Sequence, residues 1–130
     1  MSIEIGAKGR AEVPVTRENT AAAVGSGSLS VFATPSLAAL MERAAVEALA
    51  PCLAEGETSV GTRLSITHDA ATPVGMAVWA EAEVTAVDRR KISFTVRAFD
   101  GAGQVGGGTH ERFLVDAARF TAKAQDRKGL

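Results

Sequence analysis

An acidic side chain, Glu42, stands in a stretch of sequence that is otherwise apolar when helical neighbours are counted. The residues three and four positions away in a helix are small or apolar, namely Ala38, Ala39, Ala45 and Val46. Apolar surroundings disfavour the charged form of a carboxylate, which suits proton transfer near neutral pH. A structural carboxylate that reaches a backbone N–H group or an arginine is the plainer alternative. The sequence leaves both interpretations open.

His68 is the second candidate, at the end of a segment in which apolar and polar residues alternate. An imidazole can take up and release a proton near neutral pH, so it is suited to acid–base catalysis. A histidine without a partner is more often a packing residue that forms one hydrogen bond. Glu42 is the partner that the sequence offers, and that pairing would favour a catalytic interpretation.

Thr34 and Pro35 mark the start of the helix that carries Glu42. The threonine hydroxyl can accept a hydrogen bond from the first helical turn, and proline is tolerated at the first helical position, so we expect Thr34 to be the N-cap. Eight helical residues separate Thr34 from Glu42, a rise of about 12 Å. The two side chains should therefore not bond directly, although a substrate atom could lie between them.

His110 and Arg112 should project to one side of the last strand, with Glu111 and Phe113 on the other. An arginine is usually a solvated charge, but beside the glycines at 106–108 it could hold a phosphate or an acyl carbonyl. No Gly-Lys-Ser or Gly-Lys-Thr sequence follows these glycines, which excludes a phosphate-binding loop. Two histidines without suitably spaced carboxylates make a metal site unexpected.

One long helix, at residues 31–53, and five strand-like segments are predicted to position these side chains. The strands are expected near residues 10–16, 59–70, 76–87, 91–99 and 104–115. Short turns join the last four, which implies antiparallel pairing, and the single helix must cover one face. We therefore predict an α+β fold, an antiparallel sheet of about five strands wrapped around one helix. A free sheet edge favours edge-to-edge dimerisation.

The remaining segments are predicted to be less regular. Residues 20–30 are rich in Ala, Gly and Ser and should form a flexible loop, with Gly25 to Ser28 unable to bury surface. The polar segment 116–128 should hold one short, frayed helical turn. The three glycines at 106–108 should allow a bulge or a close approach of another backbone.

Length and composition narrow the class of protein. The 130 residues suit one domain, and 14 basic against 15 acidic residues exclude a strongly basic surface for nucleic acid or membrane. Cys52 is the only cysteine, so no intramolecular disulfide can form. No signal peptide and no membrane span is evident at the sequence level. We expect a cytoplasmic protein that binds neither nucleic acid nor membrane.

Several short motifs, taken together, resemble one known family. They are Phe32-Ala33-Thr34, Leu40-Met41-Glu42, Ala50-Pro51, Val60-Gly61-Thr62, Thr67-His68, Ala70-Ala71-Thr72-Pro73 and Gly108-Thr109-His110-Glu111-Arg112. In this order and register they are similar to the hotdog-fold thioesterases of the fluoroacetyl-CoA thioesterase type. The resemblance spans about residues 31–123 and agrees with the order of elements predicted above. It implies a single hotdog thioesterase domain over residues 1–130.

The resemblance also implies roles for particular residues. Thr34, Glu42 and His68 fall on the family's catalytic positions, Gly61 borders the acyl group with its backbone available to the thioester oxygen, and Arg112 lies near the substrate. Whether Glu42 or Thr34 attacks, or activates water, stays open. The family implies an acyl-CoA substrate, a homodimer with CoA entering near the subunit boundary, and no metal or cofactor besides the CoA of the substrate.

One segment departs from the family. The fluoroacetyl-specific enzyme has a longer segment before the threonine, with phenylalanines that form a lid, whereas residues 21–30 here contain no aromatic residue. We therefore expect hydrolysis of short- or medium-chain acyl-CoA without strict fluoroacetyl selectivity. The competing hypotheses are a non-catalytic hotdog module that binds CoA or an acyl group, and a hydratase or dehydratase on the same fold.

Overall fold

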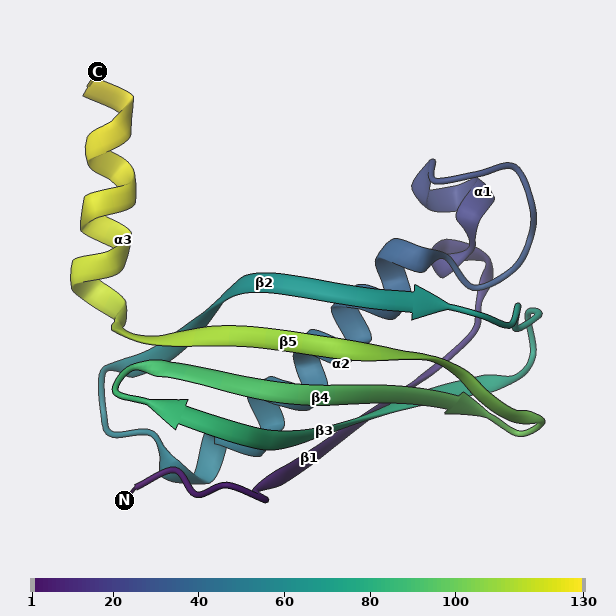
Figure 1. The fold of residues 1–130 in the computed structure, drawn as a ribbon. Helices are drawn as coiled ribbons and strands as arrows, with labels where there is room; N and C mark the ends of the chain where they lie inside the picture. Colours follow the sequence, from purple (N-terminus) through teal and green to yellow (C-terminus); the bar gives the residue numbers. More distant parts are fainter. Residues whose placement is uncertain (1, 130) are drawn as a thin grey trace.

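Five antiparallel strands form one curved sheet in the computed structural model, which describes residues 2–129 (Figure 1). Their order across the sheet is β1-β3-β4-β5-β2. The strands are β1 (Lys8–Pro14), β2 (Glu57–His68), β3 (Ala77–Asp88), β4 (Lys91–Asp100) and β5 (Gly103–Asp116). The long helix α2 (Thr34–Leu49) crosses one face of this sheet. The predicted α+β architecture is therefore confirmed.

Helix α2 is shorter than the predicted segment 31–53, and its first residue plays a different part. Its N-cap is Ala33, whose backbone is extended (φ −76°, ψ 144°), so Thr34 is the first helical residue. The prediction that Thr34 caps the helix is therefore wrong, because its hydroxyl bonds to another element. At the other end the helix gives way to the short turn η2 (Ala50–Cys52), which contains Pro51.

The core lies between α2 and the inner face of the sheet. Helix α2 contributes one apolar face, and β3 and β4 contribute every second residue, as their alternation predicts. The buried residues of these elements are Leu37, Leu40, Met41, Ala44, Ala45, Ala48 and Leu49 on α2, Val78, Ala80, Ala82 and Val84 on β3, and Ile92, Phe94, Val96 and Ala98 on β4. The same alternation would place Ala86 on this face, but Ala86 is exposed, because the β3–β4 register shifts between Val84 and Ala86.

The glycines of β5 permit close contact with β2, as predicted. A Cβ atom at Gly106 would overlap the Thr67 carbonyl oxygen, and one at Gly108 would overlap the Ser65 carbonyl oxygen. β2 also has a register shift between Gly61 and Arg63. This irregularity lies next to Gly61, one of the predicted site residues.

Residues 17–32 are more ordered than the predicted flexible loop. After η1 (Arg17–Asn19), the hydroxyl of Thr20 accepts a hydrogen bond from Ala23 N at 3.3 Å and caps the short helix α1 (Ala21–Val24). The Ala21 N–H donates to the Val31 carbonyl at 2.9 Å, which joins the two ends of the segment. The prediction of a flexible loop over residues 20–30 is wrong for its first half, which contains α1.

The C-terminal segment is longer than the predicted single turn. Helix α3 (Ala117–Asp126) is capped by Asp116, whose carboxylate accepts from Arg119 N at 2.9 Å, and the turn η3 (Arg127–Gly129) follows it. It stands away from the sheet and buries none of its residues (Figure 1). Within residues 2–129, no helix is both long and apolar enough to cross a membrane.

Candidate functional site

Thr34 and His68 meet where α2 begins and β2 ends. The Thr34 Oγ1 atom lies 2.7 Å from His68 Nδ1, within hydrogen-bond distance. The other ring nitrogen, His68 Nε2, is buried and has no hydrogen-bond partner among the described residues. A hydroxyl within bonding distance of an imidazole is the arrangement by which enzymes activate a hydroxyl or move a proton to a leaving group.

A hollow of about 340 Å³ opens beside this pair. Its lining is formed by small and apolar side chains together with the two polar partners: Ala21, Ser26, Val31, Phe32, Thr34, His68, Asp69, Ala70 and Ala71. Residues 21–31 contribute Ala21, Ser26 and Val31 to this lining, and the segment after β2 contributes residues 69–71. The hollow therefore places a volume suited to a small acyl group next to the hydroxyl and imidazole.

Glu42 pairs with Arg112 rather than standing alone. The guanidinium Nη1 of Arg112 donates to Glu42 Oε2 at 3.1 Å, and the Glu42 side chain is 42% exposed. The expected apolar surroundings of Glu42 are therefore wrong. Arg112 is buried, contrary to the usual exposed arginine, and its Nε and Nη2 atoms donate to Ser59 Oγ at 2.8 Å and Ser59 O at 3.1 Å. Burial lowers the pKa of Arg112, and the Glu42 carboxylate opposes that change.

His110 lies beside Arg112 and belongs to the same group of side chains as Glu42. Its side chain is 1% exposed, its Nε2 lies 3.1 Å from Arg112 Nη1, and its ring is stacked on Phe94 with centroids 5.8 Å apart. The strand alternation predicted that His110 and Arg112 share one side of β5. Sequence reasoning did not assign His110 a role, and Ser59 carried no signal that would have identified it.

Gly61 lies against the Glu42 carboxylate. A Cβ atom at this position would overlap Glu42 Oε2 and would come within 3.2 Å of Arg112 Nη1. The missing side chain is what allows the carboxylate to reach the guanidinium. The structure thus brings together Gly61, Glu42 and Arg112 from β2, α2 and β5.

The five predicted site residues therefore form two groups in one chain. Thr34 and Glu42 are eight helical residues apart, about 12 Å of rise, and Gly61 and His68 are seven strand residues apart, roughly 23 Å. The prediction that Glu42 is the partner of His68 is wrong within one chain, since each has a different partner. Within residues 2–129, no three His, Cys, Asp or Glu side chains are placed to bind a metal ion together.

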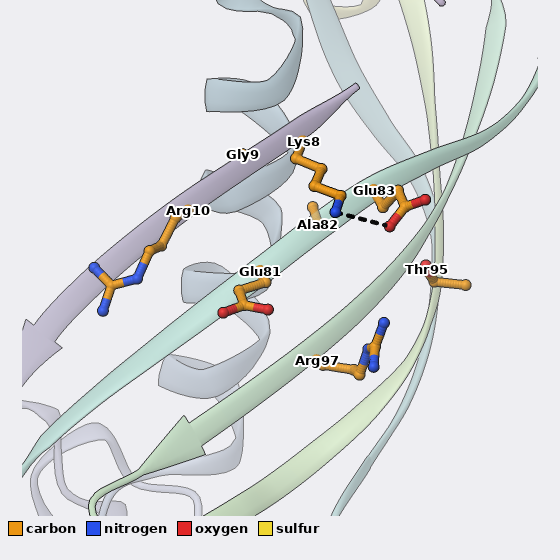
Figure 2. Close-up of a pocket in the computed structure, with 8 residues that line it drawn as sticks. All are labelled: Lys8, Gly9, Arg10, Glu81, Ala82, Glu83, Thr95 and Arg97. Carbon is orange, nitrogen blue, oxygen red and sulfur yellow. Dashed lines mark ion pairs between the residues drawn. The ribbon is translucent and has the colours of Figure 1, made fainter. Parts of the chain in front are cut away.

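A separate groove of about 410 Å³ lies over β1, β3 and β4 (Figure 2). It is lined by Lys8, Gly9, Arg10, Glu81, Ala82, Glu83, Thr95 and Arg97. Charges of both signs mix there, and the Lys8 Nζ to Glu83 Oε1 ion pair, at 3.9 Å, joins side chains that are 75% and 41% exposed. The groove contains none of the predicted site residues, so the candidate site lies elsewhere.

Solved structures with the same architecture define the class of protein. A structure of the fluoroacetyl-CoA thioesterase FlK matches with a TM-score of 0.90 and 36% identity, over 97% of this chain and 98% of that one. A thioesterase-superfamily protein of Thermus thermophilus matches with a TM-score of 0.90 and 27% identity, over 98% of this chain and 95% of that one. The curved sheet around one helix is the hotdog fold, and the chain is a hotdog-fold thioesterase.

Sequence comparison gives the family within that class. The family model described as fluoroacetyl-CoA-specific thioesterase matches residues 15–118. The fluoroacetyl-CoA thioesterase of Streptantibioticus cattleyicolor is 45% identical over 97 residues, which is 75% of this chain and 70% of that protein. The chain belongs to the fluoroacetyl-CoA-specific thioesterase family, and its reaction is the hydrolysis of an acyl-CoA thioester.

Proposed function

We propose that this chain is a cytoplasmic, homodimeric enzyme that hydrolyses short- and medium-chain acyl-CoA without strict fluoroacetyl selectivity, and that Thr34, Glu42 and His68 are its catalytic residues. The 2.7 Å contact between Thr34 Oγ1 and His68 Nδ1, beside a hollow of about 340 Å³, is the observation that carries the proposal. A structure of a FlK variant holds acetyl-CoA, which supports an acyl-CoA substrate here. CoA enters as part of the substrate, and the proposal needs no other cofactor.

The proposed chemistry divides the work among these side chains. Water, or first an enzyme oxygen, forms a bond to the thioester carbon, the C–S bond breaks, and the CoA thiolate takes a proton carried by His68. If an enzyme oxygen attacks, water then cleaves the acyl-enzyme, which gives the free acid and restores the enzyme group. His68 carries the proton, Thr34 orients water or substrate, and Glu42 acts as base or nucleophile. Gly61 and Arg112 border the acyl group, with the backbone of Gly61 available to the thioester oxygen.

The distance between the Thr34–His68 pair and the group around Glu42 supports a site that two subunits share. β2 is an edge of the sheet and contains no proline, whereas the other edge strand, β1, ends at Pro14. An unpaired strand edge can pair with the same edge of a second copy, antiparallel about a two-fold axis. An axis near Ser65, midway between Gly61 and His68, would bring Glu42 of one copy to Thr34 and His68 of the other.

Mixed dimers test the shared site. Thr34→Ala and Glu42→Gln are each expected to be inactive, but co-expression of the two gives dimers with one intact and one doubly altered site. Random pairing then restores about one quarter of the wild-type activity. If the co-expressed sample is as inactive as the single variants, the site lies within one chain and the shared-site proposal is wrong.

The wall of the hollow supports broad acyl selectivity. Residues 21–30 contribute only Ala21 and Ser26 to it, and the large Leu29 side chain of this segment is 67% exposed. Because the segment contains no aromatic residue, no aromatic side chain from it covers the acyl position. Discrimination by an apolar pocket depends on contacts that a small side chain cannot make. We therefore expect kcat/KM values for acetyl-, fluoroacetyl- and butyryl-CoA within about tenfold of one another.

Thiol release from this set of acyl-CoAs measures both activity and selectivity. Release by the wild-type protein, lost in His68→Ala with the fold retained by circular dichroism, supports the enzyme. Binding of acyl-CoA with no release would support the alternative, a non-catalytic module. A preference for fluoroacetyl-CoA of several hundredfold would overturn the selectivity proposal alone.

A further inference from the structure

We propose that His110 is a positioning residue of this thioesterase, whose neutral imidazole accepts a hydrogen bond from Arg112 and so holds the guanidinium against Glu42. The inference rests on the proposed function of Glu42 and Arg112. It adds a residue that does not touch the reacting atoms and acts only through Arg112.

The hydrogen bonds of the ring assign its tautomer. His110 Nδ1 lies 2.7 Å from the carbonyl oxygen of Arg63, and a carbonyl oxygen can only accept, so Nδ1 carries the hydrogen. In a neutral ring Nε2 then has a free lone pair, which faces Arg112 Nη1 at 3.1 Å. The backbone of β2 therefore makes His110 an acceptor for the guanidinium.

Arg112 is fixed on three sides by this arrangement. The two hydrogens of Nη1 have two acceptors, Glu42 Oε2 and His110 Nε2, each at 3.1 Å. Ser59 accepts from the other two nitrogens. Because guanidinium hydrogens lie in one plane at fixed angles, the acceptor on His110 determines where the remaining Nη1 hydrogen points, which is toward Glu42.

Protonation of His110 would turn its attractive contact with Arg112 into a repulsive one. The Arg112 guanidinium, the Glu42 carboxylate and the Arg63 carbonyl face the ring, and the Glu111 carboxylate acts on it from the other side of β5. Burial lowers the pKa of His110, Arg112 lowers it further, and the Arg63 carbonyl and the carboxylates oppose them. A protonated ring would lose its acceptor, repel Arg112 and compete for Glu42 Oε2, which lies 3.9 Å from Nε2.

Nitrogen NMR tests the tautomer without any activity measurement. The chain contains only two histidines, so a His68→Asn variant leaves a single imidazole to observe. We expect hydrogen on Nδ1 and none on Nε2 at neutral pH, and a titration midpoint below the ordinary pKa of 6.5. A hydrogen on Nε2 at neutral pH, or titration at the ordinary value, would overturn the proposal.

Two substitutions separate positioning from packing. His110→Gln keeps an acceptor near Nε2, whereas His110→Phe keeps a flat ring against Phe94 but has no acceptor. The loss of one hydrogen bond to a charged group corresponds to about tenfold or more, so we expect that drop in kcat/KM for the Phe variant and less than about threefold for Gln. The drop should lie in kcat if Glu42 acts only in the chemical step.

A core substitution far from this group provides the control. Val78→Ala removes buried volume on β3 and is expected to lower stability with kcat unchanged. Equal activity of the Phe and Gln variants, or a loss in Val78→Ala as large as in His110→Phe, would overturn the positioning role. If the wild-type protein releases no thiol, the proposed function fails, and the NMR result still decides the tautomer.

Discussion

The position of the Glu42 carboxylate depends on the absence of a side chain at Gly61. Gly61 lies on the strand facing it, and the space that a Cβ atom would take is filled by Glu42 Oε2. The overlapping atom is the far end of a flexible side chain, which can move at small cost. Gly61 does not have a positive φ angle, so alanine fits its backbone. A substitution here should therefore act on the site and not on the fold.

Gly61→Ala is expected to lower kcat at least tenfold while changing the free energy of unfolding by less than about 1 kcal/mol. The 42% exposed Glu42 side chain is displaced from Arg112, whereas Arg112 Nη1 and His110 Cε1, each 3.2 Å from the new methyl group, need only a small shift. Urea unfolding and thiol release measure the two effects. A variant with wild-type kcat would contradict the assignment of Glu42 to catalysis. A variant that loses several kcal/mol would show that the strand itself cannot accept the methyl group.

Titration of two buried side chains, His110 and Asp100, makes the free energy of unfolding depend on pH. Burial lowers the folded-state pKa of His110 below 6.5, so its contribution to stability is present above that pH and is lost as the pH falls below it. The Thr72 hydroxyl, which donates to Asp100 Oδ2 at 2.7 Å, lowers the pKa of that carboxyl below 3.8, and its contribution is lost only in stronger acid. The two groups therefore act in separate ranges.

The free energy of unfolding should thus fall between pH 7 and pH 5 in the wild-type protein, and less steeply in His110→Gln. The variant has no imidazole to protonate, so one source of proton uptake on unfolding is removed. Urea unfolding at several pH values measures the slope. Asp100→Asn is the matched control, since it should leave the slope between pH 7 and pH 5 unchanged.

Among the elements, α2 and β1 touch at their backbones. A Cβ atom at Gly9 would overlap the Ala44 carbonyl oxygen and the Ala48 backbone nitrogen. Neither atom can move without shifting the helix. The helix that carries Thr34 and Glu42 therefore packs against β1 at Gly9, where only glycine fits.

Gly9→Ala should lower the free energy of unfolding by about 1–3 kcal/mol, the usual cost of overpacking a core. Gly101→Ala is the control, because the nearest atom to its new methyl group, Met76 Cε, would lie at an ordinary 3.8 Å. Urea midpoints of the two variants give the comparison. Equal stability would mean that β1 moves away from α2 at little cost.

The periodicity of the sequence predicted those strands and that helix whose structure depends on residues close together in the chain. Alternation identified β3 and β4, because burial on one face imposes a period on each segment. Thr34 was misassigned since its residue type suits a cap, but its hydroxyl bonds to His68, 34 residues away. Ala86 departs from the alternation of β3, because the register shift there depends on the pairing with β4.

Across the whole molecule, the sequence indicates a candidate site as a set of residues but not as a set of contacts. The family motifs supplied Thr34, Glu42 and His68, yet the partner of Glu42 is Arg112, 70 residues later in the chain. Composition and spacing carry no information about such a pair. They also could not predict that Arg112 is buried, which follows from the packing of β5 between β2 and β4.

Charge exchange at the β2 edge tests the proposed dimer, in which two copies share the site. Ser65 is exposed on β2 and lies near the proposed two-fold axis, so any charge placed there should face its own copy in the dimer. Like charges opposite each other on paired strands cost roughly 0.2–1 kcal/mol, which corresponds to a dimer Kd up to about fivefold weaker. We expect this weakening in both Ser65→Glu and Ser65→Lys.

Mixing the two variants should restore the dimer, because each Glu would then face a Lys of the partner subunit. Sedimentation at several concentrations measures the Kd, and thiol release near that concentration should follow the dimer fraction if the site is shared. Arg97→Glu, in the groove over β1, β3 and β4, is the control for a general effect of charge. If the mixture dimerises no better than either variant alone, the two copies do not pair through β2 near Ser65. Activity that stays constant on dilution into monomers would contradict the shared site itself.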